Sequence, residues 1–439
     1  MYVNRRYVIG FVLALVSTIS AALPNIQHWE TKNGAKVFFV PTKGLPILDV
    51  QLVFDAGSAR DGSKKGLAAL TSTMLNEGAG GLMAQAIAEE LESVGAQLGA
   101  SSSRDFTTIK YRSLTDKTAL TTSWAVLKKV LNQPEFPLLD FKREKERTLL
   151  GIKRREESPG TLAQLALYKA MYKDHPYANA IAGEVDSVTN INVEDLISFY
   201  KTHYVAKNLI VVLVGGISRD QAEQLVGDLV NDLPEGEKTS KIQTVKDVKQ
   251  GAEIHREYSS QQTHLMYSLP VLTHNDADYF ALYVGNHILG GSGFSSRIVK
   301  DIREERGLAY SAYSYFHPMI EKGPFLMGLQ TRNEKVAEAS TAVKAVLKEF
   351  IDNGPSEEEL IAAKKNISGG FALKLDSNKK LLGNVVSIVA SGAPLGYLDH
   401  YLQNVKSITR EQIQDAFKRR VDMNKMTLVT VGQTVAEQQ

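Results

Sequence analysis

The chain has 439 residues, 43% of them hydrophobic, which is enough for two to three domains with full cores. Its formal net charge of +2 is too small to indicate nucleic acid or an anionic membrane as the main partner. With no cysteine, the chain has no disulfides, no thiol nucleophile and no thiolate zinc site, and this composition suits an oxidising compartment.

The first 22 residues have the pattern of a cleaved secretory signal. Arg5 and Arg6 precede an apolar run over residues 7–19, and the small residues 20–22 form a cleavage site. Because the run is shorter than the ~20 residues needed to span a bilayer, we expect export without a stable membrane anchor. In a Gram-negative source, the mature protein would be periplasmic.

The residues that follow predict one arrangement of strands and helices that occurs twice. Residues 27–40 have the pattern of a β-hairpin with Asn33-Gly34 at its turn, and residues 48–56 form an apolar strand. The pattern predicts further strands at 97–102, 106–113 and 208–215, and helices at 66–76, 82–94, 118–131, 138–157 and 193–204.

The second half repeats this order. It predicts a strand at 264–269, helices at 278–289 and 294–305, strands at 308–316 and 324–330, and helices at 334–353 and 356–373. The halves also close alike, with VEDLISFYKTHYVAKNLIVVLVGG in the first and REQIQDAFKRRVDMNKMTLVTVGQ in the second. A match over about 200 residues predicts duplication of a mostly antiparallel α+β domain.

Between the halves lies a polar segment without apolar periodicity, LPEGEKTSKIQTVKDV at 233–248, which we interpret as a surface linker. The expected organisation is therefore a signal peptide at 1–22, a first half at 23–232, this linker, and a second half at 249–439. Two similar halves can close on each other like a clam shell, and the cavity between them is the natural place for a ligand.

The most specific stretch is FSSRIVKDIREERGLAYSAYSYF, which begins at Phe294. Its helical spacing ends at Gly307, and an alternating strand pattern follows. This puts Arg303 on the last turn of a helix and Tyr310 near the start of the next strand, so we expect them close in space. Taken alone, they are more simply a cation at a helix C-terminus and a half-buried strand residue.

With HILGGSGFSSRI at 287–298, this stretch resembles the C-terminal half of the pitrilysin and mitochondrial-processing-peptidase family of zinc peptidases. The resemblance covers nearly the whole mature chain, about 23–439. It implies that Arg303 and Tyr310 reach across a closed chamber to hold the substrate backbone and the oxyanion opposite a zinc ion. A guanidinium fork and a phenol are suited to these roles.

The family's zinc motif, however, is lost. In the family, a first-half helix carries H-x-x-E-H, whose two His bind zinc while the Glu activates water. The matching helix here is GLAALTSTMLNEG, and it holds Ala69, Ser72 and Thr73 at those positions. The third ligand, a Glu on a later helix, is replaced by Lys153. Since a methyl group cannot ligate, a hydroxyl is a poor donor and an ammonium repels the cation, we expect no metal in this chain.

Other chemistries have weaker signals. No two of the nine His lie three to five residues apart, which leaves open only a metal site assembled from distant residues. The glycine-rich 290–293 lacks the Lys-Ser/Thr of a phosphate loop, and Ser295 and Ser296 are not in a nucleophile elbow. A metal-free hydrolase is therefore the weakest alternative.

The resemblance implies a division of labour. In bacterial heterodimers of this family, one subunit carries the zinc motif and its partner keeps only the Arg and Tyr. We therefore expect a non-catalytic subunit that pairs with a zinc-bearing homologue to cut unfolded peptides, which in this family extend an edge strand matched here by 97–103. The alternative is an inert scaffold or peptide-binding protein of the same fold. Retention of both Arg303 and Tyr310 favours the first interpretation.

Overall fold

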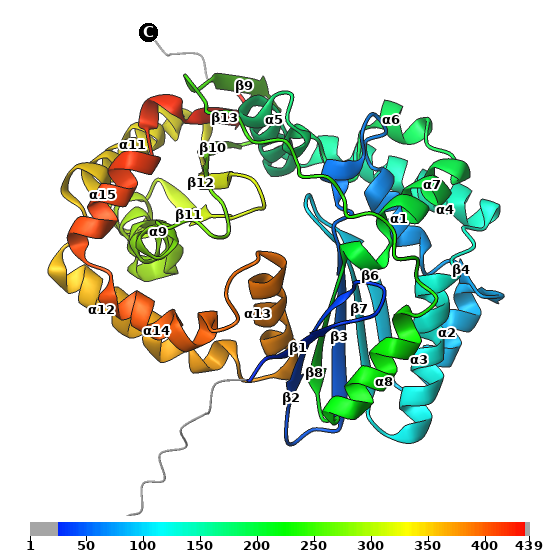
Figure 1. Cartoon of the computed structure of the whole chain (residues 1–439). Helices are drawn as coiled ribbons and strands as arrows, with labels where there is room; N and C mark the ends of the chain where they lie inside the picture. Colours follow the sequence, from blue (N-terminus) through cyan, green and yellow to red (C-terminus); the bar gives the residue numbers. More distant parts are fainter. Residues whose placement is uncertain (1–24, 435–439) are drawn as a thin grey trace, which may run out of the picture.

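The computed structural model describes residues 25–434, so the expected signal peptide at 1–22 lies outside the described residues. Within them the chain forms two halves, each built on a mixed β-sheet flanked by helices (Figure 1). This arrangement confirms the expected α+β class. Among residues 25–434, none of the helices combines the length and apolar character needed to cross a membrane.

The first sheet has six strands in the order β1-β2-β8-β3-β7-β6. Their bounds are β1 (Gln27–Glu30), β2 (Lys36–Pro41), β3 (Ile47–Phe54), β6 (Gln97–Ser102), β7 (Thr107–Leu114) and β8 (Leu209–Gly215). Strands β2 and β8 are parallel, and the other neighbours are antiparallel. The predicted hairpin at 27–40 is confirmed, with Gly34 in its turn at a φ of 92°, which glycine adopts without strain.

The second sheet has five strands in the order β11-β12-β10-β13-β9. Their bounds are β9 (Glu253–Glu257), β10 (Gln262–Leu272), β11 (Ala309–Phe316), β12 (Gly323–Arg332) and β13 (Thr427–Gly432). Strands β13 and β9 are parallel and the other neighbours antiparallel. From its parallel end, the order β9-β13-β10-β12-β11 repeats β2-β8-β3-β7-β6 with the same strand directions, which confirms two homologous halves.

Helices surround both sheets. Those of the first half are α1 (Leu67–Met74), α2 (Ala84–Ser93), α3 (Lys117–Asn132), α4 (Leu138–Arg154), α5 (Pro159–Tyr172), α6 (Val185–Thr189), α7 (Val193–His203) and α8 (Arg219–Val230). Those of the second half are α9 (Tyr279–Asn286), α10 (Arg297–Val299), α11 (Val336–Asn353), α12 (Glu357–Gly370), α13 (Asn378–Ala390), α14 (Tyr397–Ser407) and α15 (Arg410–Arg420). Capping boxes fix the starts of several, as Asn192 does for α7 and Thr409 for α15.

Some predicted bounds shift for a local reason. Helix α2 begins at Ala84 instead of residue 82, because Leu82–Met83 (β5) pairs with Gly78–Ala79 (β4) in a two-stranded ribbon. Residues 231–252, which include the expected linker, contain no helix or strand.

Two helices cross from one half to the other. Helix α5 packs on β10 and β13, where its Leu162 and Leu167 share a buried cluster with Val429. Helix α13 packs on β3 and β8, and its Val385 is buried in one cluster with Val212. Figure 1 shows α13, in orange, beside the first sheet, and α5 beside β10 and β13. Each sheet is therefore covered in part by a helix from the other half.

The turn between β11 and β12 is bound to the first half by a buried polar network. The Asp105 carboxylate accepts a hydrogen bond from the backbone N–H of Ile320 at 3.1 Å and another from the Tyr177 hydroxyl. The Tyr177 hydroxyl accepts in turn from the backbone N–H of Glu321 at 3.2 Å. Burial raises the pKa of Asp105. The network fixes the end of β11 relative to the first half.

A cavity of about 410 Å³ lies where the halves meet. Residues of the first half, the linker and the second half line it, among them Asp55, Lys238 and His274. The expected cavity between the halves is therefore present.

Candidate functional site

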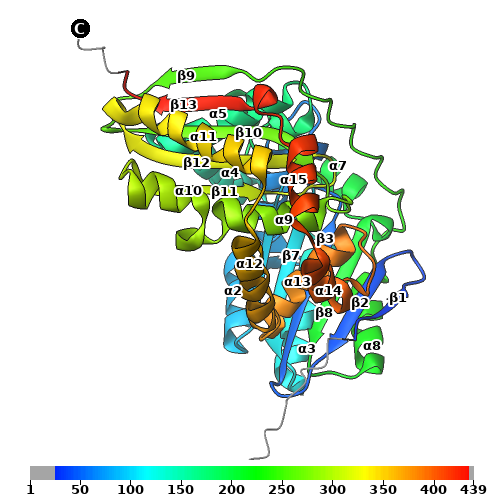
Figure 2. The ribbon, with the colours of Figure 1, turned by 90° about the vertical axis from the view of Figure 1, so that its left-hand side faces the viewer.

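Strand β11 is the edge strand of the second sheet, and both ribbon views place it between β12 and α9 (Figure 1, Figure 2). Its pairing with β12 contains a bulge. Ala309 lies opposite Thr331 and Ala312 opposite Leu329, so Tyr310 and the next residue together face a single residue of β12. A bulge re-aims the side chains of its strand, and here the Tyr310 side chain is 82% exposed.

The helix expected at 294–305 is not continuous. It is a 3₁₀ turn at Gly293–Ser295, the short α10, and a π-helical segment at Lys300–Glu305, and α9 likewise continues as a π-helical segment at His287–Gly291. The expectation of a single regular α-helix over 294–305 was therefore wrong, because this segment packs against β11 and its winding follows those contacts between distant parts of the chain. π-helical turns are rare and frequently occur at functional sites.

Arg303 lies in the second π-helical segment, next to two aromatic rings. Its guanidinium carbon is 4.5 Å from the centre of the Tyr310 ring and 4.7 Å from that of Phe294, whose side chain is 68% exposed. The structure thus brings together the two residues that the sequence placed seven positions apart, and it adds Phe294. Cation–π attraction holds such an arrangement by about 0.5–1 kcal/mol per ring at exposed positions.

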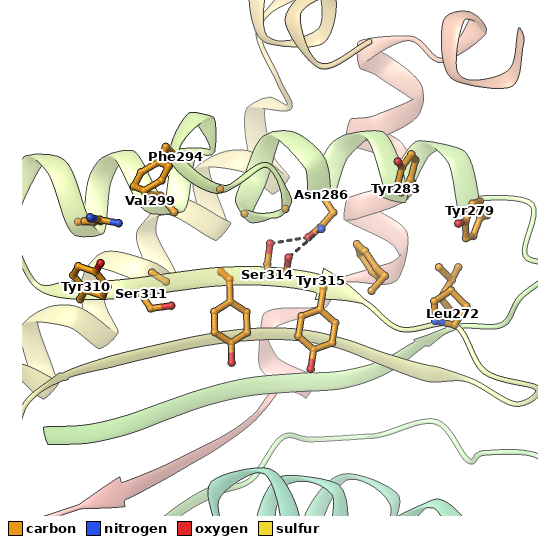
Figure 3. A pocket seen from close by; sticks show the side chains of 18 residues that line it. Leu272, Tyr279, Tyr283, Asn286, Phe294, Val299, Tyr310, Ser311, Ser314 and Tyr315 are labelled. Atoms are coloured by element: carbon orange, nitrogen blue, oxygen red, sulfur yellow. Dashed lines mark hydrogen bonds between the residues drawn. The ribbon is translucent and has the colours of Figure 1, made fainter. Parts of the chain in front are cut away.

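These residues form one end of a groove of about 510 Å³ that runs beside β11. Figure 3 shows Phe294 and Tyr310 at one end, and Tyr279, Tyr283 and Leu272 at the other. The lining residues all belong to the second half, between 272 and 318. The groove is therefore formed by the second half alone, and it is separate from the cavity between the halves.

An amide–hydroxyl pair holds the wall of the groove to the strand (Figure 3). The Asn286 side-chain amide donates to the Ser314 carbonyl at 3.1 Å, and the Ser314 hydroxyl donates to the Asn286 side-chain oxygen at 2.7 Å. Gly290 packs so closely on this pair that an added Cβ would lie 2.3 Å from the Ser314 hydroxyl oxygen. The close approach of Ser314 to the backbone therefore requires a glycine at position 290.

We therefore expect Gly290→Ala to destabilise the fold by roughly 1–3 kcal/mol, because the new methyl group forces the wall away from β11. Urea unfolding measures this loss. Gly383→Ala is the matched control, since Gly383 lies within α13 and an added Cβ there meets nothing within 4 Å. That substitution should stabilise the protein by about 0.5–1 kcal/mol. Equal effects of the two substitutions would contradict the close packing.

The four positions of the lost zinc motif, Ala69, Ser72, Thr73 and Lys153, carry no imidazole or carboxylate. The hydroxyls of Ser72 and Thr73 both donate to the Ala69 carbonyl within α1, at 2.8 and 3.1 Å. Lys153 is exposed on α4. Among residues 25–434 no three His, Cys, Asp or Glu side chains are grouped to hold a metal ion. The residues present therefore do not fit zinc.

The N-terminus of α1 keeps a well-formed cap that the sequence did not reveal. The buried Asp61 accepts from the backbone N–H of Gly66 at 2.7 Å and of Ala68 at 2.8 Å. Burial raises the pKa of Asp61 to about 7. The helix is thus held in place without its metal ligands. Strand β6 beside it is the edge of the first sheet, as expected for residues 97–103.

Several residues of the groove were not predicted. Phe294 follows the glycine-rich stretch, and Tyr279 and Tyr283 are spaced by one helical turn, which was the available signal for an aromatic face. The contact between Asn286 and Ser314 depends on the fold and has no local signal.

The fold and this site define a two-half peptidase-like protein that keeps the Arg–Tyr pair and has no metal centre among its described residues. Residues 42–185 match the family described as Insulinase (Peptidase family M16), and residues 190–367 match the Peptidase M16 inactive domain. The chain belongs to peptidase family M16.

Similar proteins agree with this assignment. A crystal structure of a peptidase M16 inactive domain from Pseudomonas fluorescens is 36% identical, has a TM-score of 0.91, and covers 94% of this chain and 99% of that one. The "Non-peptidase homolog YmxG" of Helicobacter pylori is 27% identical and covers 98% of both chains. The "Uncharacterized zinc protease YmxG" of Bacillus subtilis is 24% identical over 88% of this chain and 94% of its own length.

Proposed function

We propose that the protein is the non-zinc-binding subunit of a secreted or periplasmic heterodimeric zinc metallopeptidase. It would supply Arg303 and Tyr310 for the hydrolysis of peptides, and a homologous H-x-x-E-H subunit would supply the zinc. The observation that carries this proposal is the pair formed by half-buried Arg303 and exposed Tyr310 at one end of a groove, in a chain whose zinc positions do not fit a metal.

The chemistry of the pair supports the proposal. The guanidinium presents a planar fork of N–H donors that can donate to peptide carbonyls. The Tyr310 phenol is exposed and has no hydrogen-bond partner among residues 25–434, so it is available to donate to the oxyanion of a tetrahedral intermediate. Neither group can activate water, so cleavage requires the zinc-bound water of the partner.

The groove supports unfolded peptides as the substrates. It follows β11, an edge strand, along which an extended segment can lie, whereas a folded protein cannot supply such a segment. Export is part of the proposal because residues 1–22 have a signal-peptide pattern and the chain contains no cysteine.

Reconstitution tests this function. The chain is purified alone and mixed with an H-x-x-E-H homologue from the same source, and zinc content and cleavage of an unfolded peptide are measured. We expect neither stoichiometric zinc nor cleavage from the chain alone, and faster cleavage by the mixture than by the zinc homologue alone. Stoichiometric zinc and unaided cleavage by the isolated chain would overturn the proposal.

The second candidate is a catalytically inert scaffold or peptide-binding protein of the same fold. It is favoured by the name non-peptidase homolog given to the Helicobacter pylori relative. For a scaffold, the mixture would cleave peptides no faster than the zinc homologue does by itself.

A further inference from the structure

The groove contains a cation without a counter-ion. Arg303 is the one charged side chain among the described residues that line it. Asp301 on the same segment is paired with Arg306 at 2.8 Å, and no carboxylate of residues 25–434 lies within 4 Å of the Arg303 nitrogens. Glu304 and Glu305, which follow it, are exposed. Because this guanidinium has no carboxylate partner among the described residues, it is open to an acceptor from a ligand.

The two rings limit how that acceptor can approach. Figure 3 shows Phe294 and Tyr310 one above the other, contributed by different elements, and the guanidinium carbon lies within 4.7 Å of both ring centres. With two rings this close to the guanidinium carbon, an acceptor approaches most readily along the N–H bonds that point away from the rings. A carboxylate fits this fork with two parallel hydrogen bonds, whereas a lone carbonyl accepts with one oxygen.

The remainder of the groove has no charged side chain among the described residues that line it, and it ends at Tyr279 and Tyr283. Between Tyr310 and Phe316 the strand rises by roughly 20 Å, at about 3.3 Å per residue. An extended peptide of about seven residues therefore spans the distance from the cation to the tyrosines.

We propose that the groove beside β11 binds peptides by a carboxylate group, which Arg303 receives between Phe294 and Tyr310 while an apolar side chain of the peptide lies toward Tyr279 and Tyr283. The carboxylate is either a free C-terminus or an Asp or Glu side chain, since both present the same two oxygens. The interpretation of this binding as selection of substrates rests on the proposed function. The binding itself requires neither zinc nor a partner.

Peptide binding to the full chain alone tests the inference. The probe is an unstructured octapeptide with an aromatic residue near its N-terminus and Gln at its C-terminus, prepared with a free C-terminal carboxylate or a C-terminal amide. A third form carries the amide and has Glu in place of the terminal Gln. Isothermal titration calorimetry measures the affinities. We expect the free carboxylate to bind at least roughly tenfold more tightly than the amide.

The third peptide distinguishes the two sources of the carboxylate. If it binds as weakly as the plain amide, the groove selects a free C-terminus; if it regains the affinity, side-chain carboxylates are accepted as well. Equal affinity for all three peptides, or no binding up to about millimolar concentration, would overturn the inference.

Substitutions test whether Arg303 is the residue that binds the carboxylate. Arg303→Gln should abolish the preference for a carboxylate, and Arg303→Lys should keep only a small part of it, because an ammonium lacks the planar fork. Arg306→Gln is the matched control and should leave the preference unchanged, since Arg306 is exposed and paired outside the groove. A preference that persists in Arg303→Gln places the carboxylate elsewhere and overturns the inference.

The failures of the two proposals are distinguishable. A carboxylate preference without faster cleavage in the reconstituted mixture would remove the peptidase role and leave this inference standing. Cleavage that depends on Arg303 without any carboxylate preference would overturn this inference and leave the peptidase role standing.

Discussion

Arg303→Ala is expected to lower the rate of peptide cleavage by the reconstituted pair roughly tenfold or more, and Tyr310→Phe is expected to lower it by a similar factor. The two changes act differently. Removing the guanidinium removes a contact made before and during reaction, so KM should rise and kcat fall. Phenylalanine keeps the ring beside Arg303 and removes only the hydroxyl, so its effect should fall on kcat, as for a donor used mainly in the transition state.

Steady-state kinetics with a saturating excess of the variant over the zinc homologue measures both effects. Arg306→Ala serves as the control, because it removes a nearby positive charge that does not line the groove. If both Arg303→Ala and Tyr310→Phe match the wild type while the mixture remains active, the pair has no part in hydrolysis, and only the scaffold role remains.

Asp105→Ala is expected to lower the free energy of unfolding by about 2 kcal/mol or more at neutral pH. The substitution leaves the Tyr177 hydroxyl and the backbone N–H of Ile320 without their acceptor, where the halves meet. Urea denaturation followed by circular dichroism measures the loss. Asp247→Ala is the control, because its ion pair with Lys322 joins the linker to the same turn but the Asp247 side chain is 84% exposed. It should cost no more than about 0.5 kcal/mol.

The cost of Asp105→Ala should also depend on pH. Burial raises the pKa of Asp105 above the value of 3.8 that applies to the unfolded chain. A carboxyl group with a raised pKa in the folded state stabilises the fold most below its unfolded pKa and loses that contribution as the pH rises through the folded pKa. The difference between wild type and variant should therefore be larger at about pH 4 than at about pH 8. A difference that grows with pH would contradict the raised pKa.

The position of the Arg–Tyr pair could be predicted because its signals are local. Gly307 ends one element, the alternating residues after it begin a strand, and a helix end followed directly by a strand brings residues on either side of the turn together. The bulge at Tyr310 and the π-helical winding around Arg303 could not be predicted in this way. They depend on how β11 pairs with β12 and packs against α9, which are contacts between distant parts of the chain.

Helix α5 was missed for a related reason. The pattern of α5 is apolar on more than one side, because it is buried against the sheet of the other half, so it lacks a clear polar face. A start signal was nevertheless present, since Ser158 caps the helix and Pro159 occupies its first turn. Ser377 likewise caps α13.

Because α5 and α13 each pack on the sheet of the other half, the repeated half is not the part of the chain that folds independently. Each half contains a sheet that its own helices cover only in part and a helix whose apolar side is buried by the other half. Neither half therefore has a complete hydrophobic core by itself. We therefore expect the apolar surface of the first half to become fully buried only after the second half has been synthesised.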